Sequence, residues 1–215
     1  MQIKTFSLGP FQTNCYVLTY GGCTWVIDPG QDPEPLLGYL EAEAITPERV
    51  LLTHGHADHI AGLPALRERF PELPIAIHAD EASYPSDPAE NLSLGFGIPL
   101  VAPDPTERLE DGQVLDLSGI AVELRHTPGH SPGGLTFYIP TEGLAIVGDT
   151  LFAGSIGRTD FPHSEHEALM RSIEERLLTL PNDTTILPGH GPGSTIGRER
   201  VGNPFVLQMM TGDGG

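Results

Sequence analysis

The stretch Thr53-His54-Gly55-His56-Ala57-Asp58-His59 holds three histidines and one aspartate within six residues. It follows Val50-Leu51-Leu52, a short apolar run that predicts a buried strand. In an extended loop, residues two apart face the same way, so His54 and His56 can point toward one metal ion. The next turn would direct Asp58 and His59 toward another. Because imidazole and carboxylate are the usual ligands of zinc and related metals, the stretch predicts a metal-binding loop at a strand end.

Three further segments place a histidine or an aspartate directly after a glycine, again just past a predicted strand. They are Gly129-His130, Gly148-Asp149 and Gly189-His190. Glycine permits the tight backbone turns that a crowded site needs, and loops at strand ends can bring distant residues to one point. Chance scatter would not place every such residue after a strand and beside a glycine, so the segments predict one shared site.

The seven residues predict a dinuclear metal centre, with Zn as the first choice and Fe or Mn as alternatives. The expected ligands are His54, His56 and His130 for the first metal, Asp58, His59 and His190 for the second, and Asp149 as a bridge. Two metals roughly 3.5–4 Å apart lower the pKa of a shared water toward about 7 and polarise a carbonyl group. Asp58 and Asp149 are therefore also the predicted catalytic carboxylates. The remaining histidines, His78, His126, His163 and His166, lack this context and are expected to be structural or exposed, with His126 the best candidate for supporting a ligand.

The periodicity of the chain predicts an α/β fold of two mixed sheets with helices on the outer faces. The expected strands are Gln2–Leu8, Asn14–Tyr20, Thr24–Ile27, 50–52, Ile75–His78, 113–117, Ala121–His126, Leu135–Ile139, Leu144–Val147 and 185–187. Expected helices cover 33–44, 61–70 and 164–180, and Gly21-Gly22 should form a hairpin turn. The stretch from Ala79 to about Gly112 shows little periodicity and is expected to be a long functional or mobile loop.

Composition excludes several classes of protein. The chain of 215 residues fits one domain, expected over residues 1–210 with a disordered tail at 211–215. Its formal charge of −18, with Lys4 as the sole lysine, disfavours nucleic acid as a partner. No apolar run is long enough to span a membrane and no leader precedes the first strand, so a cytoplasmic location is expected. Cys15 and Cys23 are expected to remain reduced thiols.

The run Thr53–His59, with Gly-His, Gly-Asp-Thr and Gly-His downstream, resembles the metallo-β-lactamase superfamily over the whole chain. The resemblance implies the αββα sandwich with the site at one edge of the two sheets. Asp28 of Asp28-Pro29-Gly30 matches an early aspartate of the superfamily that lies close to the metal loop. A simple turn-forming role for Asp28 is the alternative.

Within the superfamily, five segments are similar to short bacterial glyoxalase II-like proteins. They are Phe11–Tyr16, Asp87–Ser93, Ser155–Phe161, Pro188–Gly191, and Glu199 with Asn203-Pro204-Phe205. This implies hydrolysis of a small-molecule thioester such as S-lactoylglutathione by a metal-bound hydroxide. Full-length glyoxalase II adds a helical glutathione-binding domain, which is not expected here. Arg158 could bind a substrate carboxylate or pair with Asp160 to fix its loop.

Other activities of the superfamily remain open to different degrees. Gly157–Phe161 also resembles persulfide dioxygenases, which hold one iron and would need only His54, His130 and Asp149. A zinc β-lactamase is disfavoured because neither cysteine lies near a ligand segment, and a ribonuclease is disfavoured by the acidic charge. A non-catalytic binding module would be expected to lack ligands that this chain retains. The oligomeric state is not encoded in these patterns.

Overall fold

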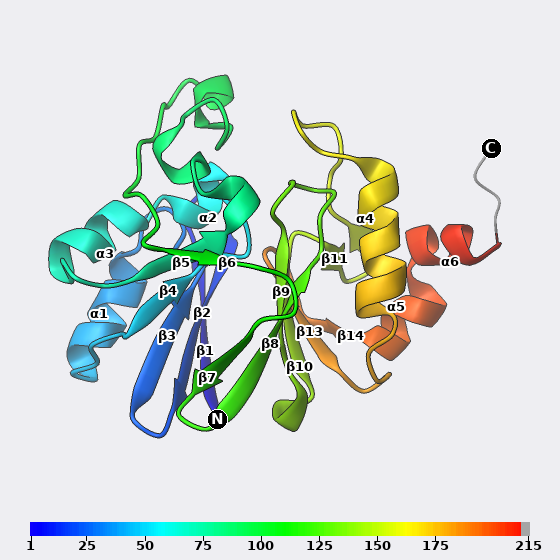
Figure 1. Cartoon of the computed structure of the whole chain (residues 1–215), viewed down its shortest axis with the longest axis horizontal. Helices are drawn as coiled ribbons and strands as arrows, with labels where there is room; N and C mark the ends of the chain where they lie inside the picture. The colour runs from blue at the N-terminus through cyan, green and yellow to red at the C-terminus, as the bar shows by residue number, and fades with distance from the viewer. Residues whose placement is uncertain (212–215) are drawn as a thin grey trace. The chain divides into compact units, whose positions relative to one another are not determined.

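A computed structural model describes residues 1–211 and divides them into two compact units. Unit 1 comprises residues 1–110 and 116–120, and unit 2 comprises residues 111–115 and 121 onward. Each unit is built on one six-stranded sheet with helices (Figure 1). The expectation of one domain over residues 1–210 stays a prediction. Of the expected tail, Thr211 is the last residue of a helix and the rest lies outside the described residues.

The sheet of unit 1 has the strand order β1-β2-β3-β4-β5-β6. Its strands are β1 Gln2–Leu8, β2 Thr13–Tyr20, β3 Cys23–Ile27, β4 Arg49–Leu51, β5 Ile75–His78 and β6 Glu107–Leu109. The first three form an antiparallel meander, with Gly21 and Gly22 in the left-handed conformation at the predicted hairpin turn. From β3 to β6 the strands are parallel. The carboxyl ends of β3, β4 and β5 therefore meet at one edge of the sheet.

Helices cover one face of this sheet through a shared apolar core. α1 (Glu34–Ala42) contributes Leu36 and Leu40, and α3 (Leu63–Arg69) contributes Leu63 and Leu66. These side chains pack with the alternate strand residues Val17, Val26, Val50, Ile75 and Ile77. Figure 1 shows the two helices, in blue to cyan, on the same side of the sheet. The packing holds the strand ends, and hence the loops that follow them, in fixed positions.

The stretch after β5 contains more structure than the sequence predicted. Three short 3₁₀ turns occur in it, η1 (Ala79–Glu81), η2 (Tyr84–Ser86) and η3 (Ser93–Phe96), followed by the missed strand β6. Asn91 is fully buried, and its side-chain amide donates hydrogen bonds to the carbonyl oxygens of Tyr84 and Leu100 at 3.1 Å each. The stretch is thus an anchored loop built around one buried amide.

The sheet of unit 2 has the order β14-β13-β10-β9-β8-β7. Its strands are β7 Val114–Leu117, β8 Ile120–His126, β9 Leu135–Ile139, β10 Leu144–Gly148, β13 Thr185–Pro188 and β14 Ser194–Thr195. A separate hairpin pairs β11 (Leu151–Phe152) with β12 (Ser155–Ile156). β9 is antiparallel to both β8 and β10, and β13 is parallel to β10. Strands β8, β10 and β13 consequently all point the same way.

Helices of unit 2 pack against its sheet. The expected helix over 164–180 is α4 (His166–Ser172), continued by a π-helical turn, η5 (Ile173–Leu177). The short helices α5 (Ile196–Gly202) and α6 (Pro204–Thr211) were not predicted. Leu169, Ile173, Ile196 and Val206 from these helices share a core with the sheet residues Ala145, Val147 and Ile186. Figure 1 shows α4, α5 and α6 on the same side of this sheet.

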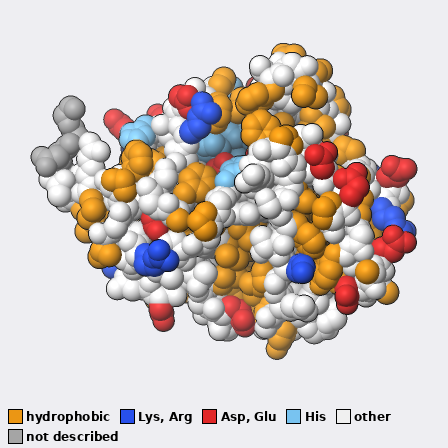
Figure 2. Space-filling model, turned by 180° about the vertical axis from the view of Figure 1, so that it is seen from behind, with side chains coloured by type: hydrophobic (Ala, Val, Ile, Leu, Met, Phe, Trp, Pro, Cys, Tyr) orange, Lys and Arg blue, Asp and Glu red, His pale blue; other side chains and the backbone are white. Residues whose placement is uncertain are grey.

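The described surface shows few basic side chains, as the composition of the chain leads one to expect. On the face drawn in Figure 2, lysine and arginine side chains of the described residues occur in separate places and form no continuous basic patch. No helix within residues 1–211 combines the length and apolar character needed to cross a membrane. Cys15 is buried, Cys23 is partly exposed, and both are free thiols, which confirms the expectation of reduced cysteines.

Candidate metal centre

The predicted ligands of unit 1 lie at the carboxyl edge of its parallel strands. Asp28 follows β3, the segment from His54 to His59 follows β4, and Glu81 follows β5 through η1. Open parallel sheets bind ligands at this edge because the loops leaving adjacent strands converge there. The β-strand topology of unit 1 thus gathers one imidazole cluster and two carboxylates that are distant in sequence.

The histidines of this segment are packed against one another. The ring centroids of His54 and His56 lie 4.6 Å apart, and those of His54 and His59 lie 4.1 Å apart. One ligand atom of His54 lies within 4.8 Å of one in His56 and one in His59, and the same holds for Asp58 and His59. α2 (Ala57–Ile60), which the sequence did not predict, turns Asp58 and His59 back toward His54. Unit 1 therefore brings together all four of its predicted ligands.

Asp28 fixes the orientation of this loop, which confirms the expectation that it lies beside the metal loop. Its Oδ1 accepts a hydrogen bond from the Thr53 backbone N–H at 2.8 Å, and its Oδ2 accepts one from Thr53 Oγ1 at 2.6 Å. Oδ2 also lies 3.0 Å from Nδ1 of His59. Since a carboxylate only accepts, the His59 Nδ1–H donates, and Nε2 is the nitrogen presented to a metal. Asp28 has a φ of 50°, so its turn-forming role holds as well.

Neighbouring loops of unit 1 close around the ligand segment. Thr13 Oγ1 donates to Oδ2 of Asp58 at 3.0 Å, and the Ala57 backbone N–H donates to the Asn91 carbonyl at 2.9 Å. A Cβ added at Gly55 would approach Cβ of Tyr84 to 2.5 Å, so only glycine fits between His54 and His56. Tyr84 is therefore a packing residue that closes one side of this turn. Burial, followed by the nearby Glu81 and Glu90 charges, raises the pKa of its hydroxyl.

The predicted ligands of unit 2 follow the carboxyl ends of the three strands that share a direction. His130 follows β8, Asp149 follows β10 and His190 follows β13. Oδ2 of Asp149 lies 3.6 Å from Nε2 of His130 and 3.4 Å from Nε2 of His190. One carboxylate oxygen thus faces two imidazole nitrogens, the placement expected of a bridging ligand. The preceding glycines Gly129 and Gly148 have positive φ values as predicted, whereas Gly189 is not among the positive-φ residues.

A backbone carbonyl orients His130. Its Nδ1–H donates to the carbonyl oxygen of Arg158 at 2.9 Å, which leaves Nε2 as the metal-binding nitrogen. Gly157 makes this contact possible, because a Cβ there would lie 1.9 Å from the Asp149 carbonyl oxygen and 3.2 Å from Cβ of His130. The sequence reasoning did not anticipate this role for the 157–158 backbone.

The Arg158 side chain pairs with Asp160. Nε donates to Oδ1 at 2.9 Å and Nη2 donates to Oδ2 at 2.7 Å, and the guanidinium lies 4.4 Å from the Phe161 ring centroid. The hydrogen bonds with Arg158 lower the pKa of Asp160 and raise that of Arg158. Of the two roles considered for Arg158, the structure shows the loop-fixing pair. Substrate binding by Arg158 stays a prediction.

The other histidines have structural contacts. Nε2 of His126 lies 2.8 Å from the Pro132 carbonyl oxygen, so it supports the loop that carries His130. His78 accepts a hydrogen bond from the Asp80 backbone N–H at 3.3 Å and caps η1. Nδ1 of His166 lies 3.2 Å from Thr159 Oγ1, and His163 is an exposed residue with a φ of 64°.

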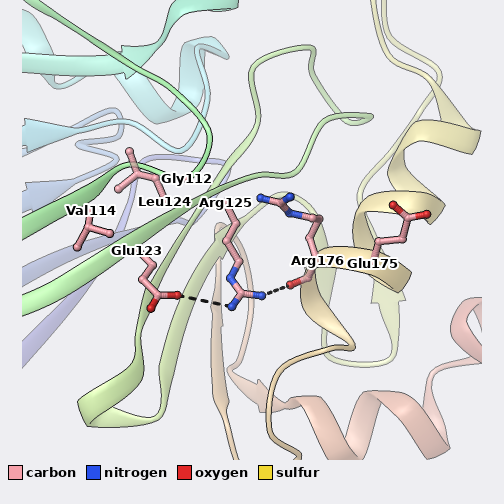
Figure 3. Close-up of a pocket in the computed structure, with 7 residues that line it drawn as sticks. All are labelled: Gly112, Val114, Glu123, Leu124, Arg125, Glu175 and Arg176. Atoms are coloured by element: carbon pink, nitrogen blue, oxygen red, sulfur yellow. Dashed lines mark hydrogen bonds and ion pairs between the residues drawn. The ribbon is translucent and has the colours of Figure 1, made fainter.

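Unit 2 also carries a pocket of about 340 Å³ away from its ligand segments (Figure 3). Its lining residues are Gly112, Val114, Glu123, Leu124, Arg125, Glu175 and Arg176. Arg125 lies 3.6 Å from Glu123 and donates to the Arg176 carbonyl at 2.8 Å, while Arg176 pairs with Asp111. Because its cations are already paired and no predicted ligand lines it, this pocket is not the candidate site.

The donors in both units fit metal ions. The Asp149 oxygen lies too far from its imidazoles for good hydrogen bonds, yet all three groups converge as ligands of a shared ion do. His59 and His130 each have Nδ1 engaged behind the ring, the arrangement that metal-ligating histidines adopt. The division of the seven ligands between two metals combines residues of both units and stays a prediction.

Comparison with known proteins agrees with this chemistry. The family model described as "Metallo-beta-lactamase superfamily" matches residues 8–190. The chain is 37% identical to the probable metallo-hydrolase YqgX of Bacillus subtilis, over 96% of this chain and 98% of that protein. It is 35% identical to the hydroxyacylglutathione hydrolase GloC of Haemophilus influenzae, with the same coverage of both chains.

Solved structures share the fold over nearly the whole chain. BLEG-1, a B3 metallo-beta-lactamase, superposes with a TM-score of 0.91 at 39% identity, covering 95% of this chain and 99% of its own. TTHA1623 in a di-iron-bound form superposes with a TM-score of 0.85 at 38% identity, covering 94% and 99%. The predicted α/β class with two mixed sheets is thereby confirmed. The chain belongs to the metallo-beta-lactamase superfamily.

Proposed function

We propose that this protein is a dinuclear metal-dependent hydrolase of thioesters, acting on S-lactoylglutathione or a related small thioester. The observation that supports it best is the pair of ligand sets, each at the carboxyl ends of strands that run in one direction. In both sets a ring orientation is fixed from behind, by Asp28 for His59 and by the Arg158 carbonyl for His130. Such preparation of donors is expected of a metal site used for catalysis.

The residues would divide the work as follows. Six ligands would hold two divalent ions, His54, His56 and His130 on one and Asp58, His59 and His190 on the other, with Asp149 between them. When bound, the ions supply Lewis acidity and lower the pKa of a water molecule. Overall, water adds to the thioester carbonyl, the carbon–sulfur bond breaks, and the products are an acid and a free thiol. Thr13 and Asp28 keep Asp58 and His59 in place while this occurs.

The thioester class is favoured by the similarity to GloC, whose name describes hydrolysis of hydroxyacylglutathione. The pairing of Arg158 with Asp160 removes the most obvious anchor for an anionic glutathione arm. We therefore expect weak selectivity for the thiol part of the substrate and a higher KM for glutathione thioesters than for small neutral ones.

The test measures metal content per chain beside thiol release from S-lactoylglutathione. Near two metals per chain with thiol release, lost in His54→Ala and His190→Ala, supports the proposal. His166→Ala is the matched control, because this histidine lies outside both ligand sets. One iron per chain with oxygen uptake on glutathione persulfide and no thiol release would instead identify a dioxygenase.

Hydrolysis of β-lactams is the second candidate, favoured by the 39% identity to BLEG-1. A β-lactam amide and a thioester are both hydrolysed by addition of water to a carbonyl carbon, so one metal centre can act on either class of substrate. A chromogenic cephalosporin assayed with the same protein separates the two. Turnover of the cephalosporin without thiol release would replace the thioesterase proposal with a lactamase.

A further inference from the structure

We propose that Glu81 is a positioning residue for the metal centre, holding the turn between His54 and His56 and adding negative charge beneath it. The inference rests on the proposed metal centre but not on any particular substrate. Neither the ligand pattern nor the proposed hydrolysis assigns a task to this residue.

The contact that points to this role is short and direct. Oε2 of Glu81 accepts a hydrogen bond from the Gly55 backbone N–H at 2.5 Å. Gly55 separates the two ligands His54 and His56, so its peptide determines the angle between their side chains. Glu81 reaches it from η1, which follows β5, the strand next to β4 in the sheet. The parallel register of β4 and β5 therefore places Glu81 beside the ligand turn.

Burial gives the carboxylate further significance. Glu81 is 0% exposed, and burying a charged carboxylate is costly unless positive charge or several donors compensate it. The Gly55 backbone N–H is one such donor. Two divalent ions among the adjacent imidazoles would add positive charge near this carboxylate, and their mutual attraction would strengthen metal binding.

Packing around Gly55 makes this position unusually sensitive. The Tyr84 side chain lies against Gly55, leaving no room for the turn to shift toward it. The hydrogen bond from Glu81 and the packing of Tyr84 together confine the Gly55 peptide. Loss of the Glu81 carboxylate would therefore allow this peptide to rotate. His54 and His56 are the first residues that such a rotation would move.

Glu199 provides a matched comparison within the same chain. It is also buried, at 4% exposure, and its Oε2 accepts a backbone N–H, that of Gly154, at 2.8 Å. Its other contacts are Ser194 and Asn203, which hold the C-terminal helices. Glu199 is thus a buried carboxylate with a structural role, and none of the three contacts just named involves a predicted metal ligand.

The experiment uses the full chain loaded with Co²⁺, in wild-type protein and in Glu81→Gln, Glu81→Ala and Glu199→Gln variants. Co²⁺ affinity is measured by competition with a chelator, ligand geometry by the visible absorption bands, and folding by urea unfolding. Glu81→Gln should weaken Co²⁺ binding about tenfold with the bands unmoved, because the amide oxygen still accepts the Gly55 N–H. Glu81→Ala should weaken it up to about 100-fold and shift the bands. Glu199→Gln should lower the unfolding midpoint but leave the affinity within twofold.

Different outcomes overturn different statements. The role of Glu81 is wrong if both Glu81 variants bind Co²⁺ as wild type does. It is also wrong if they lose affinity only in proportion to their loss of folding stability, on the scale that Glu199→Gln provides. If wild type binds no Co²⁺, the metal centre itself is wrong. If wild type binds two Co²⁺ and releases no thiol from any thioester, the proposed hydrolysis fails and the comparison of Glu81 variants still decides the present inference.

Discussion

Single backbone positions determine whether the ligands of each unit can meet. Gly157 passes so close to the Asp149 carbonyl that no larger residue fits, and the next residue supplies the acceptor for His130. A side chain added there would displace two predicted ligands at once. In contrast, Gly38 in α1 has open space where a Cβ would point.

Gly157→Ala should therefore lower the free energy of unfolding by about 2 kcal/mol or more, because the added methyl overlaps backbone that cannot move freely. Gly38→Ala is the control, and it should be neutral or stabilising by up to about 1 kcal/mol, since alanine is the better helix former. Urea unfolding of the two variants checks this. Equal midpoints would show that the 157 backbone tolerates a side chain.

Cys15 should be unreactive in the folded protein. Burial, followed by the charge of Asp28, raises the pKa of its thiol well above the usual value, so the reactive thiolate is scarcer than in a free cysteine. Titration with Ellman's reagent at pH 8 should modify Cys23 in the native state and Cys15 only after unfolding. Cys15→Ala identifies the slow thiol, and rapid modification of two thiols in native protein would contradict the assignment.

At this scale the sequence indicated the ligands and two of their supports, Asp28 and His126, but it gave no sign of the others. Histidines and aspartates after strands are recognisable because metal chemistry restricts the residue types. Glu81 carried no such signal, since a glutamate in an irregular stretch is usually exposed. The Arg158 carbonyl could not be predicted either, because every residue has one.

The elements of the fold were predictable in proportion to their length. The ten expected strands and the helices α1, α3 and α4 could be predicted because each has either a periodic pattern of apolar residues or a continuous apolar run. β6, β11, β12 and β14 have two or three residues each and lack a continuous apolar run like the one at 50–52. α2 was not predicted because Asp58 and His59 within it give a pattern of metal ligands and not a helical one. α5 and α6 were not predicted because Gly197 and Pro204 lie at their starts, and glycine and proline usually indicate a turn or the end of a helix.

A buried side-chain amide links the helices α5 and α6 to the β11–β12 hairpin. Asn203 is fully buried, and its Nδ2 donates to the Ser155 carbonyl and to Glu199, each at 2.9 Å. This hairpin directly follows Asp149 and precedes Gly157. The Asn203-Pro204-Phe205 similarity noted in the sequence thus has a structural explanation.

Asn203→Ala should destabilise the protein by about 2 to 3 kcal/mol, because it leaves a buried carboxylate and carbonyl without this donor. Glu167→Ala is the control, since its 3.9 Å ion pair with Arg171 is exposed and worth little. Thermal unfolding of both variants measures the difference. A change in Asn203→Ala no larger than in the control would show that the Asn203 hydrogen bonds do not hold these helices in place.

For the molecule as a whole, repulsion among the charges that sum to −18 destabilises the folded state, and bound divalent cations would reduce this repulsion. Ligand binding to the folded state alone also stabilises it, by about 2.7 kcal/mol at a hundredfold excess over Kd. Metal and stability are therefore expected to be linked throughout this chain.

Removal of metal with a chelator should lower the melting temperature by roughly 5 to 10 °C for a chain of this size, and added Zn²⁺ should restore it. His54→Ala should melt at one temperature with or without chelator, whereas His166→Ala should behave as wild type. Differential scanning calorimetry checks this. Identical wild-type melting with and without chelator would show that no metal stabilises the fold.

The edge strand β1 carries the chain's one lysine, Lys4, on its exposed side, with its amine 5.8 Å from the Tyr39 ring centroid. Lys4 is the only lysine in the sequence. Dyes, resins and cross-linkers that react with lysine side chains must consequently attach at this border of the sheet. Covalent immobilisation through lysine would thus attach every molecule at Lys4 and hold all molecules in the same orientation, with the segment from His54 to His59 left unmodified.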